Sequence, residues 1–317
     1  MCTHNGARFV EQQLRSIVGQ RTPPTEIVVS DDASSDDTLA VVARVVAEID
    51  SSIRVTIIEN GVALGVRANF EQALLACGGD LIALSDQDDV WHEDRLDSLR
   101  ERFDNSPDLL LVSSNAALVD QNGVSLGHTL FEALEISASQ RESLNGGGAF
   151  DELARRNLVT GATSMIRRSL LTVAVPIPAP WLHDEWLAII AAATGELGVL
   201  DRVLTDYRQH DTNQVGATRL GIAGKISRLR EPRGNRYDYL LERATVLRDR
   251  LQLLGPTVPA QLSALAEAKI AHQSARARLP AARWRRVAPV AREVASGRYA
   301  RFSRGTLDII RDLVQPV

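Results

Sequence analysis

The residues best suited to chemistry are acidic and follow short apolar runs. Asp86-Gln87-Asp88-Asp89 comes directly after the run 80–85, and Asp31-Asp32 comes after the run 26–30. Two carboxylates one residue apart at the end of a strand supply hard oxygen ligands, which suit Mg²⁺ or Mn²⁺ holding a diphosphate. The carboxylates of Asp31 and Asp32 could hold a base or a ribose. Capping of the helix that follows is the alternative for both groups.

Two later positions add candidate groups. Asp184 opens a helical pattern and could act as a general base, with a helix N-cap as the alternative. His210 could be a metal ligand or a phosphate contact, against a purely structural role. The glycine-rich dinucleotide fingerprint and the P-loop are both absent, so nicotinamide and ATP-transfer chemistry are disfavoured.

Alternating strands and helices must position these groups. Strands are expected over 26–30, 54–58 and 80–85, with helices over about 36–48 and 66–77. This alternation predicts a parallel sheet covered by helices, in which ligands bind at the carboxyl ends of the strands. Those ends carry the polar residues Asp31, Asp32, Asn60, Asp86 and Asp88. We therefore expect one site along this edge.

The rest of the chain changes character near residue 218. Strands are expected over 109–113 and 158–166, a mobile glycine-rich loop over 140–150, and a helix over 186–194. Beyond residue 218 the strand signals stop. Helices are expected over 237–254 and 259–279, with one or two amphipathic helices in 281–317. Two domains follow, residues 1–217 and 218–317.

Composition and charge set broad limits. The 317 residues are 44% apolar and 24% charged, which excludes disordered, collagen-like and disulfide-stapled chains. Residues 218–317 hold 20 basic and 8 acidic residues, and residues 1–217 hold 16 and 32, giving formal charges of +12 and −16. Either this is solvated surface charge, or the basic part lies near an anionic partner. Two cysteines, the lack of a membrane-length apolar run and a polar start predict a cytoplasmic chain.

Seven short motifs, in order, resemble those of the family 2 glycosyltransferases with the GT-A fold. They are Cys2-Thr3-His4-Asn5-Gly6, Asp31–Thr38, Arg67-Ala68-Asn69-Phe70, Ser85–Trp91, Thr160-Gly161, His183-Asp184 and Tyr207–His210. The resemblance covers residues 2 to about 217. It implies an α/β GT-A domain, with a Rossmann-like, mixed and mainly parallel sheet flanked by helices, and a C-terminal helical extension. The motif over 85–91 is similar to that of the rhamnosyltransferase-type branch, which builds bacterial cell-surface polysaccharides.

The resemblance also implies a role for each matched residue. The donor-binding set is Thr3, Asn5, Asp31, Asp32, Arg67, Asn69 and Asp86. The metal set for Mg²⁺ or Mn²⁺ is Asp86, Asp88 and His210, with Asp88 as the direct ligand. Asp184 matches the catalytic base, and His183 stands where the family often has an acidic residue.

These roles predict an inverting, metal-dependent glycosyltransferase. Its donor would be a dTDP- or UDP-sugar, dTDP-rhamnose in the branch it resembles, and its acceptor a cell-surface glycan or a lipid-linked sugar. Family members have an apolar strand before the Cys-Thr-x-Asn segment, whereas Met1 directly precedes Cys2 here. We therefore expect a shortened first strand or a true start upstream. The alternative function is a catalytically silent nucleotide-sugar-binding protein.

The basic C-terminal region predicts a peripheral contact with the inner face of the cell membrane, because arginines interleaved with aromatic residues suit an anionic interface. Packing within the chain or between subunits is the alternative. A nucleic-acid partner is not expected, since residues 1–217 are acidic, and the oligomeric state stays open. The residues expected at the membrane are Arg283, Arg285, Arg286, Arg292, Arg298, Arg301 and Arg304, with Trp284, Tyr299 and Phe302.

Overall fold

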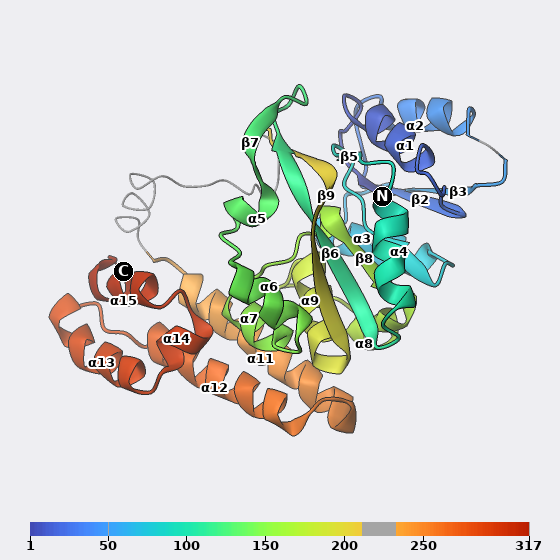
Figure 1. The fold of residues 1–317 in the computed structure, drawn as a ribbon. Coiled ribbons are helices and arrows are strands. Elements are labelled where there is room, and N and C mark those ends of the chain that lie inside the picture. The colour runs from blue at the N-terminus through green and yellow to red at the C-terminus, as the bar shows by residue number, and fades with distance from the viewer. Residues whose placement is uncertain (50, 211–232, 317) are drawn as a thin grey trace. The chain divides into compact units, whose positions relative to one another are not determined.

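The computed structural model describes residues 1–49, 51–210 and 233–316. The chain divides into two compact units, the first made of Met1–Gly147 with Val159–Ala217 and the second of Gly148–Leu158 with Thr218–Val317 (Figure 1). Residues 148–158, which the sequence pattern placed in the first domain, thus group with the C-terminal helices.

A parallel three-stranded sheet begins the first unit, in the order β1-β2-β3. Its strands are β1 (Cys2–Thr3), β2 (Glu26–Asp31) and β3 (Arg54–Glu59), joined by α1 (Val10–Val18) and α2 (Thr38–Val46). Val10, Leu14 and Ile17 recur at helical spacing, so α1 presents one apolar face, and this face packs into the core that holds Val29 of β2. These elements match the expected strands and helix closely.

The second sheet of this unit is mixed. Its order is β4-β8-β6-β9-β5, and β7 pairs with β6. Strand β9 runs parallel to β6, and the other pairs are antiparallel. The strands are β4 (Leu81–Ala83), β5 (Val90–Trp91), β6 (Leu109–Val119), β7 (Ser125–Thr129), β8 (Ser164–Arg167) and β9 (Glu196–Arg208). The helices of this unit after α2 are α3 (Val66–Ala76), α4 (Arg95–Asp104), α5 (Leu130–Ala133), α6 (Ala138–Asn145), α8 (Leu171–Ala174) and α9 (His183–Thr194).

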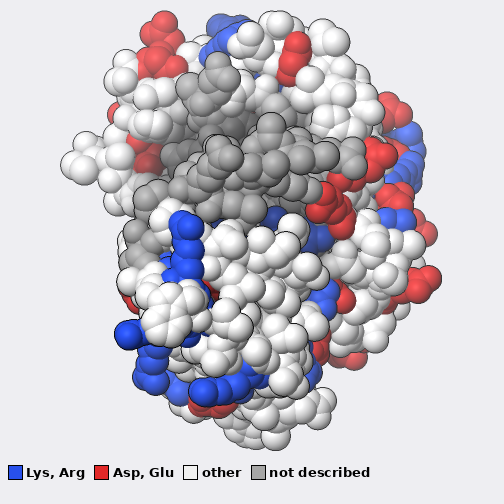
Figure 2. All heavy atoms as spheres, turned by 90° about the vertical axis from the view of Figure 1, so that its left-hand side faces the viewer, with Lys and Arg blue, Asp and Glu red and all other residues white. Residues whose placement is uncertain are grey.

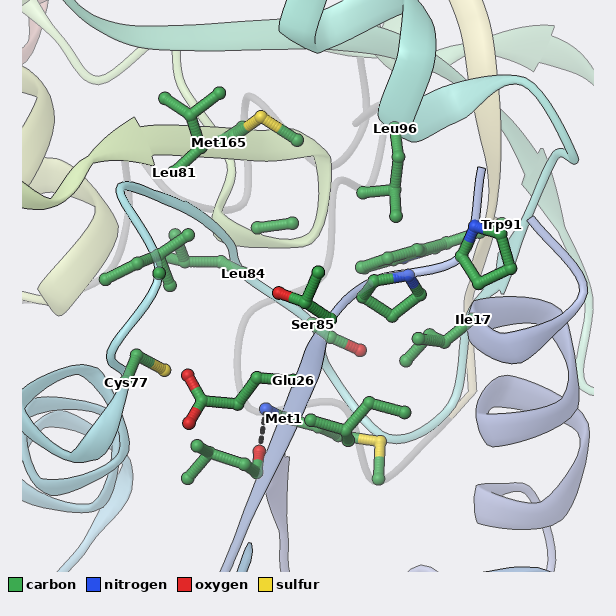
Figure 3. Close-up of a pocket in the computed structure, with 18 of the residues that line it drawn as sticks. Met1, Ile17, Glu26, Cys77, Leu81, Leu84, Ser85, Trp91, Leu96 and Met165 are labelled. Carbon is green, nitrogen blue, oxygen red and sulfur yellow. Dashed lines mark hydrogen bonds between the residues drawn. The ribbon is translucent and has the colours of Figure 1, made fainter. Parts of the chain in front are cut away.

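Strand β1 joins the two sheets. Ser30 N donates to Met1 O at 2.9 Å on one side, and Cys2 N donates to Ser85 O at 3.2 Å on the other. The strand is only two residues long, as the sequence led us to expect. Next to Met1, between β2 and β4, lies a largely apolar cavity of about 230 Å³ (Figure 3). Residues of β2, α3, β4 and α4 line it, and none of the predicted site residues does.

The second unit is helical. Helices α11 (Arg236–Leu254) and α12 (Ala260–Ala277) lie side by side, and α13 (Val287–Ala295), α14 (Arg298–Phe302) and α15 (Thr306–Val314) follow (Figure 1). Leu279, Val290 and Tyr299 form its apolar core. The expected one or two helices in 281–317 are therefore three. No described helix is long and apolar enough to cross a membrane.

Two expectations for the middle of the chain are wrong. The predicted mobile loop over 140–150 is mostly helical, in α6 and α7 (Ala149–Arg155). Ser137 and Gln140 form a reciprocal capping box, and Leu144 is fully buried, so α6 forms although glycines follow it. The predicted strand 158–166 is limited to Ser164–Arg167, because Gly161–Thr163 form a 3₁₀ turn.

Candidate functional site

The carboxyl ends of the strands meet at one edge, as predicted. His4 N, just after β1, donates to Gln87 Oε1 at 2.8 Å, and Gln87 Nε2 donates to His4 O at 3.0 Å. A Cβ at Gly6 would lie 2.1 Å from Gln87 Oε1. A larger residue at position 6 would therefore displace the Gln87 side chain from its two hydrogen bonds with the His4 backbone.

The buried Asp31 side chain links β1 and the loop after β2 at this edge through hydrogen bonds. Its Oδ1 accepts hydrogen bonds from Thr3 Oγ1 and Ser34 Oγ, both at 2.6 Å, and its Oδ2 accepts from Ser34 N at 2.8 Å. Asp31 is fully buried. The next residue but one, Ala33, has a φ of 58°, which is strained for a side-chain-bearing residue. The carboxylate therefore holds β1 against a tightly turned loop.

Asp32 and Asn5 order the neighbouring loops. Asp32 accepts hydrogen bonds from Leu64 N at 2.5 Å and Gly65 N at 2.9 Å, which pins the loop after β3. Asn5, with a φ of 49°, accepts from Ser35 N at 2.8 Å. The structure thus brings Thr3, Asn5, Asp31 and Asp32 together, and it engages each of them with the chain's own groups.

Asn69 and Arg67 brace α3. The buried Asn69 accepts from Ser30 Oγ at 2.6 Å and Asn60 Nδ2 at 3.1 Å, and it donates to Ser30 O at 2.9 Å. Arg67 donates to Ile177 O at 2.7 Å. Within the described part of the chain, neither side chain forms a hydrogen bond or ion pair with Asp86 or Asp88.

Asp88 and His210 meet although 122 positions separate them. His210 Nε2 lies 2.7 Å from Asp88 Oδ2, and the imidazole stacks on the Phe9 ring at 5.1 Å between centroids. Pairing of β5 with β9 places these two ends side by side. Two of the three predicted metal ligands therefore face each other directly.

The third predicted metal ligand, Asp86, lies in a field of negative charge. Burial raises the pKa of Asp86 to about 7, and the nearby carboxylates of Asp88 and Asp184 add to the rise. Burial raises the pKa of Asp89 well above its usual range, and the negative charges of Asp88 and Asp86 add to the rise. Asp89 Oδ1 accepts from Arg208 N at 3.0 Å, whereas its buried Oδ2 has no partner. A cation would relieve this concentration of charge.

Asp184 occupies the first turn of α9. Its Oδ2 accepts from Gly161 N at 3.1 Å and its Oδ1 from Glu185 N at 2.8 Å. The preceding residue, His183, stacks on Phe70 at 3.7 Å with 7° between the ring planes. Burial lowers the pKa of His183 to about 3, so the ring is neutral near pH 7 and brings no positive charge beside Asp184.

Helix capping does not explain these carboxylates. Helix α4 begins after Asp94, α2 after Asp37 and α9 after Leu182. In none of the three helices does the side chain of the N-cap residue accept a hydrogen bond from a backbone amide of the helix. The acidic residues of the candidate site therefore lie outside the N-cap positions.

Two buried arginines escaped prediction. Arg208 donates to Asp88 O at 2.7 Å and to Gln12 Oε1 at 2.9 Å, and its place in the motif beside His210 was an available signal. Arg95 lies 3.9 Å over the Trp91 ring, and its Nε and Nη1 have no hydrogen-bond partner. Burial lowers the pKa of Arg95 to about 9 against the opposing charges of Asp89 and Asp86. Its sequence position resembles any first-turn arginine, so only packing reveals it.

The donor set suits a divalent cation shared with a substrate. Among the described residues, no three His, Cys, Asp or Glu side chains form a metal centre on their own. Mg²⁺ is commonly held by one or two carboxylates together with substrate phosphates, and carboxylate and imidazole ligands both suit Mn²⁺. Of the predicted metal ligands, Asp88 and His210 lie together and offer one carboxylate and one imidazole, so the remaining ligands would have to come from a substrate diphosphate.

The chain is similar in sequence to known glycosyltransferases. The chain is 28% identical over 239 residues to a dTDP-rhamnosyl transferase of Shigella flexneri, covering 72% of this chain and 78% of that protein. It is 26% identical over 221 residues to an uncharacterized glycosyltransferase of Nostoc sp., covering 66% and 63%.

Solved structures share the fold. S. aureus TarS 1–349 in complex with UDP-GlcNAc has a TM-score of 0.59 at 16% identity, covering 98% of this chain and 88% of that one. Mannosyltransferase PcManGT from Pyrobaculum calidifontis, in complex with GDP-Man and Mn²⁺, has a TM-score of 0.55 at 18% identity, covering 93% and 74%. The family described as Glycosyl transferase family 2 has a model that matches residues 1–171. The chain therefore belongs to the family 2 glycosyltransferases and has their GT-A fold.

Proposed function

We propose that this protein is an inverting glycosyltransferase that uses a nucleoside-diphosphate sugar and a divalent cation. One observation carries the proposal. Asp184, near the start of α9, lies close enough to Asp86 for its charge to raise the pKa of that carboxyl, although 98 positions separate them. This proximity supports the proposal that a catalytic base and a metal-binding carboxylate pair act in one site. Membership of a glycosyltransferase family supports the same chemistry.

In the proposed reaction, the acceptor hydroxyl attacks the anomeric carbon from the face opposite the nucleotide. The bond from that carbon to the diphosphate breaks and its electron pair leaves with the diphosphate. Asp184 takes the hydroxyl proton as the new bond forms. The amides of Gly161 and Glu185 hold the carboxylate in one orientation, which favours a near-attack geometry.

The leaving diphosphate gathers negative charge. A divalent cation, when bound, would stabilise that charge as a Lewis acid. We assign Asp88, Asp86 and His210 to hold it. Arg208 keeps the Asp88 backbone in place, and its guanidinium lies 5.0 Å over the Phe9 ring, on which His210 also stacks.

The donor pocket is assigned to the loops around Thr3, Asn5, Asp31 and Asp32. Because these side chains already bind the chain's own groups, we propose that they act mainly by shaping the loops that meet the base and ribose. Asn69 and Arg67 brace α3 on the diphosphate side. The similarity to a dTDP-rhamnosyl transferase supports dTDP-rhamnose as donor. The proposed acceptor is a cell-surface glycan or lipid-linked sugar at the inner face of the membrane.

Calorimetry with dTDP-rhamnose, UDP-sugars and GDP-mannose, with and without Mn²⁺ or Mg²⁺, tests donor choice. We expect metal-dependent binding of dTDP-rhamnose that Asp88→Asn weakens. Asp184→Asn should leave that binding unchanged and lower turnover about 10²-fold or more. Asp249→Asn, at an exposed ion pair of α11, is the matched control. Donor binding without turnover over a broad acceptor screen would favour the silent binding protein, and no nucleotide binding by the folded chain would refute both.

A further inference from the structure

In the last 37 residues the acidic side chains are buried, whereas several of the basic side chains are exposed. The three buried acidic residues are Glu293, Asp308 and Asp312. Asp312 accepts two hydrogen bonds from Arg276, at 2.7 and 3.0 Å, and also binds Tyr237 and Tyr299. The three acidic side chains of this stretch are thus turned inward, so the exposed charged side chains of its described residues are arginines.

Five of the eight arginines here have no carboxylate partner among the described residues, and four of these five are exposed. Arg286 is buried and donates to backbone carbonyls, Arg298 and Arg311 pair with Glu293 and Asp308, and Arg301 pairs with Asp151 of the same unit. The four exposed arginines without a carboxylate partner among the described residues are Arg283, Arg285, Arg292 and Arg304. Figure 2 shows Lys and Arg side chains gathered around uncharged surface in the lower half of its view.

Exposed apolar side chains lie among these arginines at helical spacing. On the turn before α13 and on α13 itself they are Trp284, Val287 and Val294, with Trp284 74% and Val287 59% exposed. Val290 and Glu293 of α13 are buried, and Val290 follows Val287 by three residues and precedes Val294 by four. Val287 and Val294 therefore lie at the border of the side of α13 that packs on the core. Helix α15 packs against α13 and exposes a second row, Leu307, Ile310 and Val314. Neither row serves the core of the unit.

The sequence prediction for this region needs correction. Tyr299 and Phe302, expected at a membrane, are buried. Tyr299 donates to Asp312 Oδ2 at 2.6 Å, so its hydroxyl belongs to the core. Arg286, Arg298 and Arg301 are likewise committed to partners in the chain. The exposed arginines without a carboxylate partner and the exposed large apolar residues of this region are instead the following set: Trp284, Val287, Val294, Leu307, Ile310 and Val314, with Arg283, Arg285, Arg292 and Arg304. We call it the arginine–tryptophan face.

We propose that the arginine–tryptophan face binds the surface of an anionic lipid bilayer. An exposed tryptophan between two arginines suits the interface, where the ring meets the acyl boundary and the guanidinium groups meet lipid phosphates. Charge complementarity favours lipid over a second copy of this chain, because two such faces would repel. This proposal rests on the proposed function and adds to it the class of lipid and the residues that would bind it. Its test does not depend on turnover.

Co-sedimentation of the full chain with vesicles tests the proposal. Vesicles of phosphatidylcholine alone are compared with vesicles containing 30% phosphatidylglycerol, at low and at high salt. We expect binding to the anionic vesicles that high salt weakens. The variant Arg283→Gln/Arg285→Gln/Arg292→Gln should lower the partition coefficient about 100-fold. Trp284→Ser/Val287→Ser should lower it at least about 10-fold.

Matched controls distinguish an effect of this face from an effect of net charge or of misfolding. Arg21→Gln/Arg54→Gln/Arg100→Gln removes the same charge from exposed arginines of the first unit. Leu253→Ser changes an 82% exposed residue at the end of α11. Both controls should bind vesicles like the native chain, and thermal unfolding should show all variants folded. The proposal would be overturned if the charge control lost as much vesicle binding as the arginine variant, or if the Trp284→Ser/Val287→Ser variant bound like the native chain. Self-association of the native chain that the arginine–tryptophan substitutions abolish would also overturn it.

Discussion

Replacing Gly161 with alanine would create a steric overlap beside Asp184, the candidate base. A Cβ at this position would lie 2.8 Å from His183 Nε2 and 3.5 Å from Asp184 Cβ. Real carbon–nitrogen contacts are longer by several tenths of an ångström, so one partner must move. His183 has little freedom, because it is buried and stacked on Phe70 at 3.7 Å. The Gly161 turn must therefore shift, and with it the amide that binds Asp184 at 3.1 Å.

The size of the effect follows from that overlap. Overpacking of this kind costs about 1–3 kcal/mol of folding free energy. A misplacement approaching 1 Å at a reacting group can lower turnover about 10²-fold. We expect Gly161→Ala to lower kcat about 10- to 100-fold while the KM for donor changes little, since the donor loops lie on other strands. The assay is steady-state transfer with each substrate varied, together with thermal unfolding.

A double-variant cycle makes the argument refutable. His183→Ala in the Gly161→Ala background removes the overlap and should recover part of the lost kcat, giving a coupling of at least about 0.5 kcal/mol. Gly78→Ala is the matched control, since its Cβ would meet Glu26 Oε2 at an ordinary 3.6 Å. Native kcat in Gly161→Ala, or strictly additive effects in the double variant, would show that His183 and Gly161 do not position Asp184.

Three further outcomes are expected. Asp312→Asn removes the nearer of the two carboxylates that pair with the buried Arg276, leaving Asp308 at 3.8 Å, and should lower the stability of the second unit by about 3 kcal/mol, measured by chemical unfolding. The pKa of Asp86 is raised, so without divalent cations its contribution to stability is present below about pH 4 and lost as pH rises to about 7. Asp86→Asn removes this titration, so the native-minus-variant difference in unfolding free energy should fall over that range, and a difference that stays constant with pH would contradict the prediction. About five apolar residues added before Met1 should fill the cavity between β2 and β4 and raise Tm, whereas a Gly-Ser extension should not.

The sequence alone predicted the elements that carry the site. The apolar runs before Asp31-Asp32 and Asp86 correspond to β2 and β4, and the helix expected near 186–194 corresponds to α9. These elements are predictable because local apolar patterning sets strand and helix formation. The motifs then placed their polar residues at one edge, since the carboxyl ends of parallel strands share an edge. The helix over 138–145 was missed because capping by Ser137 outweighs the glycines that follow it.

Only the tertiary structure decided what each of these residues touches. Asp31 and Asp32 turned out to hold the loops, because backbone amides reach their carboxylates in the folded chain. Arg95 proved to be buried behind the acidic segment, although nothing in its local sequence distinguishes it from a surface arginine. The same holds for the C-terminal region, where eight arginines look alike in sequence. Packing pairs or buries four of them and leaves the other four exposed and without a carboxylate partner among the described residues, because burial and pairing depend on contacts between residues far apart along the chain.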